Sequence, residues 1–122
     1  MVAMRKELEK ELAKFKKYLI IVEGKRDRQA LEEIGFSNIF VINETGKSLY
    51  EKIEQIENIA GKTKVCILTD FDKKGKQLYI ILKRELVKEG VKLDNKLRDI
   101  LAGEKISHIE GLSSYIKKLA LI

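Results

Sequence analysis

Carboxylate side chains stand directly after two apolar runs of the chain. Glu23 follows residues 18–22, and Asp70 and Asp72 follow residues 65–69. Short runs rich in Ile and Val, bounded by charged or glycine residues, predict strands that are buried on both faces. The carboxyl ends of such strands lie where open α/β sheets build their sites. If the three acids converge there, they provide the hard oxygen ligands that Mg²⁺ prefers.

Each acidic pattern also has a purely structural interpretation. Asp72 can cap a helix that follows it, Asp70 can accept hydrogen bonds within a turn, and Gly24 can simply permit the turn after Glu23. The two patterns together favour a metal site, since each ends a predicted core strand. Clustered carboxylates repel one another and raise the pKa of at least one member, and a bound cation relieves that repulsion.

The apolar periodicity predicts the elements that position these acids. Strands are expected at residues 18–22, 38–42, 64–69 and 105–109, and helices at 4–17, 25–34, 47–60, 74–88, a short segment after the cap Asp94, and 113–121. Alternating strands and helices predict right-handed crossovers, and therefore a Rossmann-like α/β fold of three layers. Its central four-stranded parallel sheet has helices on both faces. A strand order of 2-1-3-4 would bring Glu23 beside Asp70 and Asp72.

The bulk composition fits one domain over residues 1–122, with an amphipathic helix at 1–17, a core at 18–110 and a closing helix at 111–122. The first helix could cover a sheet face, pair with a second subunit or offer lysines to nucleic acid. A single cysteine excludes a disulfide framework, and no apolar run reaches the roughly 18 residues of a membrane span. We therefore expect a cytoplasmic protein. Its dense Lys and Glu are typical of thermophile proteins.

The net charge of +6 is unevenly distributed, because residues 62–98 carry eleven basic and five acidic side chains. This excess surrounds Asp70 and Asp72 and suits a phosphate-bearing partner, although a lysine-rich solvated surface would look the same. The candidate phosphate contacts are Lys25, Lys47, Lys73, Lys74 and Lys76.

Three further features fall near the predicted strand ends. Gly46 and Lys47 open a predicted helix, where backbone amides can hold a phosphate, although Ser48 or Thr45 could equally be a plain cap. His108 and Glu110 lie at the end of the predicted fourth strand and could border the site. A lone histidine is more often structural.

Two segments resemble motifs of the Toprim family. Residues 20–27 read Ile-Ile-Val-Glu-Gly-Lys-Arg-Asp, followed by Leu31 and Gly35, and are similar to the first motif. Residues 68–75 read Leu-Thr-Asp-Phe-Asp-Lys-Lys-Gly and look like the second, and residues 41–49 resemble the segment between them. Toprim domains occur in topoisomerases, bacterial primases, OLD-family nucleases, recombination proteins and the ribonuclease that matures 5S ribosomal RNA.

The resemblance implies a role for each matching acid. It makes Glu23 the candidate general acid/base and a further metal ligand, and Asp70 and Asp72 the ligands of Mg²⁺, for which Mn²⁺ could substitute. Asp27 lies one helical turn beyond Glu23 and could orient a ligand or Lys25, or could simply be an acid at a helix start. One Cys and one His cannot supply the zinc site of a primase, so a small stand-alone Toprim protein is expected.

Three functions remain open from the sequence. The first is an Mg²⁺-dependent nuclease or nucleotidyl-transfer enzyme acting on RNA or DNA. The second is a non-catalytic module that binds metal and nucleic acid and acts with a protein partner. The third is a receiver-like phosphate-binding protein, which would need a phospho-acceptor Asp and a partner lysine late in the chain, and no clear lysine follows the fourth strand at the right place.

Overall fold

A parallel three-stranded sheet forms the centre of the computed structural model, which describes residues 2–44, 46–104 and 106–119, with side chains from residue 6 onward. The strands are β1 (Leu19–Val22), β2 (Ile39–Val41) and β3 (Val65–Ile67), in the order β2-β1-β3. Ile21 of β1 pairs with Phe40 on one side and Ile67 on the other. The predicted α/β class and the adjacency of the first and third strands are therefore confirmed.

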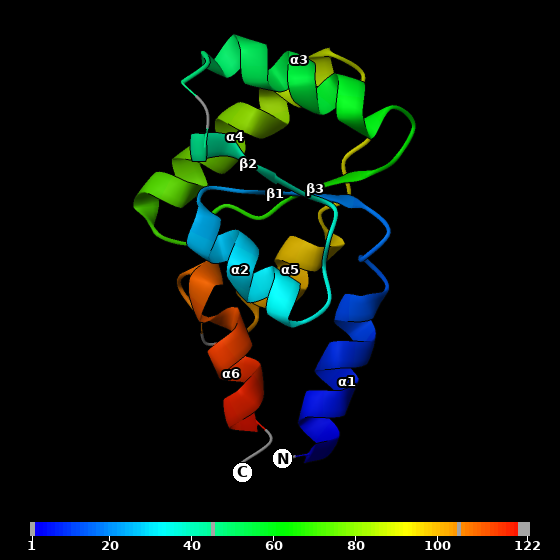
Figure 1. Cartoon of the computed structure of the whole chain (residues 1–122), viewed down its shortest axis with the longest axis vertical. Helices are drawn as coiled ribbons and strands as arrows, with labels where there is room; N and C mark the ends of the chain where they lie inside the picture. The colour runs from blue at the N-terminus through cyan, green and yellow to red at the C-terminus, as the bar shows by residue number, and fades with distance from the viewer. Residues whose placement is uncertain (1, 45, 105, 120–122) are drawn as a thin grey trace.

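Helices cover both faces of this sheet, which gives the three layers of Figure 1. One face carries α1 (Val2–Ala13), α2 (Lys25–Glu33), α5 (Lys96–Ala102) and α6 (Leu112–Leu119), and the other carries α3 (Leu49–Ala60) and α4 (Lys73–Lys88). Along β1 the side chains alternate between them, so that Ile20 and Val22 pack toward the first group while Leu19 and Ile21 pack toward the second. Both faces of β1 are buried, which explains its continuous apolar sequence.

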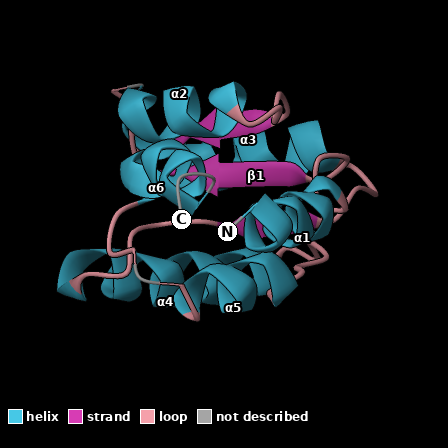
Figure 2. Ribbon diagram, turned by 90° about the horizontal axis from the view of Figure 1, so that it is seen from below, coloured by secondary structure: helices cyan, strands magenta, loops and turns pink. Residues whose placement is uncertain are grey.

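The amino-terminal helix covers part of one sheet face. Leu8, Leu12 and Phe15 are buried in the same cluster as Ile116 of α6, and α1 and α6 are in contact (Figures 1 and 2). Met4, which the periodicity places on the same apolar face, has a side chain outside the described ones. Of the three roles expected for this segment, packing on the sheet is the one that the structure shows.

The prediction of a fourth strand at residues 105–109 is wrong for the residues that the structure describes. Residues 106–109 form no strand, and Lys105 lies outside the described residues. Arg98 explains the difference, because its guanidinium donates to the carbonyl oxygens of Ile67 and Thr69, the groups that a fourth strand would need. Besides Arg98, short main-chain contacts reach this side of β3: Leu93 bridges Val65 at one end, and the Phe71 amide donates to the Ser107 carbonyl at the other.

Capping residues set where the helices begin. α3 starts at Leu49 rather than at Lys47, because Ser48 is its cap: its hydroxyl accepts from the Glu51 amide at 3.2 Å. α4 starts at Lys73 with Asp72 as its cap. The short 3₁₀ helices η1 (Ile42–Glu44) and η2 (Ile109–Gly111) complete the described elements.

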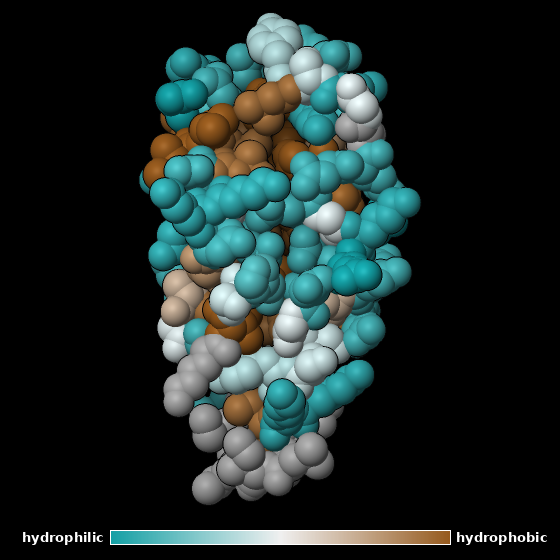
Figure 3. Space-filling model, turned by 90° about the vertical axis from the view of Figure 1, so that its left-hand side faces the viewer, coloured by the Kyte–Doolittle hydropathy of each residue, from teal (hydrophilic) through white to brown (hydrophobic). Residues whose placement is uncertain are grey.

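Large exposed apolar side chains are confined to one layer of the described structure. They all lie on α3 and α4, at Leu49, Tyr50, Ile59, Ile80 and Val87. Figure 3 shows apolar side chains gathered in the upper part of one face of the molecule, toward this layer. No helix among the described residues is long and apolar enough to cross a membrane.

Candidate metal centre

The ends of β1 and β3 bring Glu23 and Asp70 into direct contact. The Asp70 amide donates a hydrogen bond of 2.8 Å to Oε2 of Glu23. The same edge is tightened by the Leu68 amide, which donates to the Ile21 carbonyl at 2.7 Å. Glu23 is thus held by the turn that carries the two aspartates, as parallel neighbouring strands require.

Asp70 and Asp72 each accept a hydrogen bond from a backbone amide. Oδ1 of Asp70 accepts from the Ile109 amide at 2.8 Å, and Oδ1 of Asp72 accepts from the Gly75 amide at 2.8 Å, which caps α4. Each of these bonds occupies one oxygen of its carboxylate. The structural interpretation is compatible with the ligand interpretation, because each carboxylate has a second oxygen.

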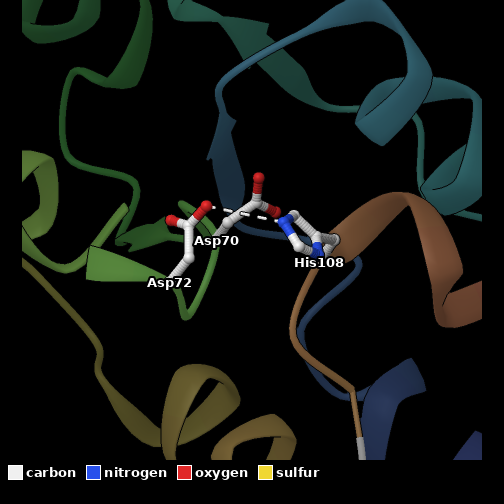
Figure 4. Close-up of side chains that lie close together, drawn as sticks. All are labelled: Asp70, Asp72 and His108. Carbon is white, nitrogen blue, oxygen red and sulfur yellow. Dashed lines mark ion pairs between the residues drawn. The ribbon is translucent and has the colours of Figure 1, made fainter. Parts of the chain in front are cut away.

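His108 completes a group of three potential ligands with these aspartates. One ligand atom from each of Asp70, Asp72 and His108 lies within 4.8 Å of the others, and Nε2 of His108 is 3.4 Å from Oδ2 of Asp72 (Figure 4). The side chains of His108 and Asp72 are 50% and 44% exposed, so solvent or substrate can reach the group. Carboxylate oxygens and an imidazole nitrogen form a donor set suited to a divalent cation. Glu23, which accepts from the Asp70 amide, is not one of these three residues.

Gly75 lets α4 approach the aspartate turn closely. A Cβ atom added to it would lie 2.1 Å from the carbonyl oxygen of Asp70. The Thr69 hydroxyl donates to the Gly75 carbonyl at 2.7 Å and draws the two segments together. The glycine that follows the Asp-x-Asp pattern is therefore a packing requirement of the site.

Arg98 supports the aspartate turn from behind and was not recognised in the sequence. Nη1 of Arg98 donates to the carbonyls of Ile67 and Thr69, and Nη2 donates to the Asp70 carbonyl at 3.3 Å. The guanidinium lies 4.6 Å from the ring centre of Phe71 and 4.4 Å from that of Tyr79. Burial lowers its pKa, opposed by Tyr79, Asp70 and Glu23. One sequence signal could have indicated that Arg98 is buried: it lies three residues before Leu101, on the apolar face of its helix.

Asp27 is buried behind the Glu23–Gly24 turn. Its Oδ2 accepts from the Gly24 amide at 2.9 Å, which fixes the start of α2. Burial raises the pKa of Asp27, and the carboxylates of Asp70, Glu23 and Glu110 raise it further, against the lowering effect of the Gly24 bond. Glu110 is exposed on η2, which packs against α2, the helix that carries Asp27.

The candidate phosphate contacts are all exposed. Lys25 begins α2, and Lys73, Lys74 and Lys76 lie in the first turn of α4, which holds no acidic residue. Gly46 and Lys47 precede α3, whose cap is Ser48, and the alternative cap Thr45 lies outside the described residues. These helices follow β1, β2 and β3 in the chain, so they begin on the side of the sheet formed by the carboxyl ends of the strands, where the acids lie.

Comparison with known proteins identifies relatives of most of the chain. Residues 17–95 match the family model of the Toprim domain. A UPF0292 protein from Methanocaldococcus jannaschii is 35% identical over 102 residues, covering 81% of this chain and 78% of that protein. One from Methanosarcina barkeri is 36% identical over 107 residues, covering 84% and 72%. A solved protein structure from Aquifex aeolicus superposes with a TM-score of 0.73 at 33% identity, covering 86% of this chain and 94% of that one.

Proposed function

Because the chain belongs to the Toprim domain family, alongside the UPF0292 proteins, we propose that it is a small metal-dependent nuclease acting on RNA or DNA. The observation that carries the proposal is the meeting of Glu23 with the Asp70–Asp72 turn at the carboxyl edge of the sheet. A binding module gains little from carboxylates that repel one another, whereas a metal-dependent enzyme needs them.

Each acid has a distinct part in the proposed chemistry. Asp70 and Asp72 would hold Mg²⁺, or Mn²⁺ in its place, through the oxygens that their structural hydrogen bonds do not use. A metal ion bound there would neutralise the charge that develops on the phosphodiester. Glu23 keeps Oε2 on the Asp70 amide, and its Oε1 would move a proton to or from the reacting oxygen.

The exposed lysines would bind the nucleic-acid backbone. Cations at a helix amino terminus oppose the helix dipole, so the lysines at the start of α4 do not stabilise their own helix. Phosphate at that position would interact favourably with the lysines and with the dipole together. Of the basic excess of residues 62–98, Lys73, Lys74 and Lys76 directly follow the Asp70–Asp72 turn, at the start of α4.

A second candidate function is a binding module that acts with a protein partner. The exposed apolar side chains of α3 and α4 favour it, since Tyr50, Ile80 and Val87 are 69%, 62% and 56% exposed. Such a layer fits a protein contact. In that case the lysine edge would hold nucleic acid while the partner supplied catalysis.

Cleavage of labelled nucleic acid separates the two candidates. Structured RNA and single- and double-stranded DNA would be incubated with Mg²⁺, Mn²⁺ or chelator. Glu23→Gln and Asp70→Asn each keep the acceptor of the bonds that shape the site, and Glu54→Gln changes an exposed carboxylate on α3. We expect metal-dependent cleavage that is lost in the first two variants and kept in the third. Absence of cleavage, with salt-sensitive binding that survives both site substitutions, would favour the binding module.

A further inference from the structure

The main chain fixes His108 against the aspartate turn from both sides. On one side the Phe71 amide donates to the Ser107 carbonyl at 2.9 Å. On the other, the Ile109 amide donates to Oδ1 of Asp70 at 2.8 Å. His108 is the residue between these two bonds, so its position relative to the turn is set by backbone geometry rather than by its side chain. Figure 4 shows the imidazole directed at the two aspartates.

A second contact orients the imidazole ring. Nδ1 of His108 lies 2.8 Å from the hydroxyl of Ser107. When Nδ1–H donates to that hydroxyl, the lone pair of Nε2 remains on the side of Asp72, 3.4 Å from its Oδ2. Metal-binding histidines usually have their second ring nitrogen held in this way by an oxygen. A lone pair facing a carboxylate is unfavourable, so a cation between Nε2 and Oδ2 would favour this tautomer. In the other tautomer the Ser107 hydroxyl donates to Nδ1 and Nε2–H faces Asp72, with no need of a cation.

We propose that His108 is a ligand of the metal ion and that it shifts the preference of the site from Mg²⁺ toward Mn²⁺, Co²⁺ and Zn²⁺. The inference rests on the metal site of the proposed function. Mg²⁺ favours oxygen ligands alone, whereas imidazole binds the first-row transition ions more strongly. The competing explanation is a simple ion pair between His108 and Asp72, which would contribute nothing to metal selection.

The chain's single histidine allows a direct spectroscopic test. Mn²⁺ would be added to the full chain, freed of any histidine tag, and pulsed electron paramagnetic resonance would be recorded. A nitrogen coupling typical of imidazole can then come only from His108, and we expect to observe it. Bound Mn²⁺ without that coupling would overturn the inference while leaving the metal site in place.

Calorimetric titration with the metals alone tests the preference. In His108→Ala we expect Mn²⁺ and Co²⁺ to bind at least about tenfold more weakly, because even partners outside the ligand shell cost that much when removed. Mg²⁺ binding should change by less than about threefold, since Mg²⁺ takes oxygen ligands and retains waters. Ser114→Ala, an exposed change on α6, is the matched control.

The outcomes separate this inference from the proposed function. An equal loss for all three ions, or no loss for any, would refute a selective role of His108. If Mn²⁺ binds to neither the wild type nor His108→Ala, the metal site itself is refuted, and the inference with it. Metal binding that requires Asp70 but is indifferent to His108 refutes the inference alone.

Discussion

Replacing Gly75 with alanine should disrupt the aspartate turn more than any other small change in the site. The added Cβ would lie 2.1, 2.6 and 2.8 Å from the oxygen, carbon and nitrogen of Asp70, whereas such atoms essentially never approach within 3.0 Å. The first turn of α4 and Asp70 must therefore separate by about 0.9 Å. All three obstructing atoms belong to the backbone, so no side-chain rotation can relieve the clash.

The expected cost follows from the contacts that this movement stretches. Overpacking costs about 1–3 kcal/mol. The bond from the Thr69 hydroxyl to the Gly75 carbonyl and that from the Gly75 amide to Asp72 would each lose about 1 kcal/mol. We therefore expect Gly75→Ala to lower the free energy of unfolding by about 3–5 kcal/mol, and to weaken metal binding because Asp70 and Asp72 are displaced.

Urea denaturation measures this change, with Gly111→Ala as the matched control. A Cβ on Gly111 meets nothing within 4 Å, so the same methyl group should alter stability by less than about 1 kcal/mol. If the free energy of unfolding of Gly75→Ala lies within about 0.5 kcal/mol of the wild-type value, α4 does not approach Asp70 as closely as described.

Two substitutions and one labelling experiment probe the surroundings of the site. Arg98→Leu should lower the free energy of unfolding by about 3 kcal/mol, because hydrogen bonds from a buried cation to carbonyl oxygens are lost. A variant that is as stable as the wild type in urea denaturation would refute this. Burial raises the pKa of Cys66 to about 12, so a thiol reagent should label it only on unfolding, and rapid labelling without urea would contradict its burial. Because the pKa of Asp27 is raised in the fold, its stabilising contribution is present below its ordinary value of 3.8 and is lost as the pH rises through the folded value. Unfolding measured from pH 4 to 7 should therefore show the wild type losing stability relative to Asp27→Asn, and parallel curves would argue against the raised pKa.

Local patterns were sufficient to predict most of the elements and the edge at which the acids meet. The run that ends at Glu23 is apolar because β1 is buried on both faces, and the run that ends at Asp70 pairs beside it. Capping residues moved the helix boundaries by a residue or two, as at Ser48, because side-chain bonds rather than hydrophobic spacing decide where a helix starts.

What the sequence did not predict depends on contacts between distant residues. Arg98 takes the carbonyl oxygens of Ile67 and Thr69, 31 and 29 residues away, and so prevents the fourth strand. The segment at His108 was expected to be that strand. Instead, the amide of Ile109 donates to the side chain of Asp70, 39 residues away, and this bond holds the segment against the aspartate turn. Apolar periodicity contains no information about such pairings.

Equilibrium metal binding tests the central claim most directly. Titration of the metal-free chain with Mn²⁺ and Mg²⁺ would be followed by calorimetry for the wild type, Asp70→Asn, Asp72→Asn and Glu54→Gln, the exposed control on α3. We expect saturable binding that is lost in both aspartate variants and unchanged in the control. Binding that is absent from the wild type, or that persists in both aspartate variants, would contradict a metal centre at the carboxyl edge of the sheet.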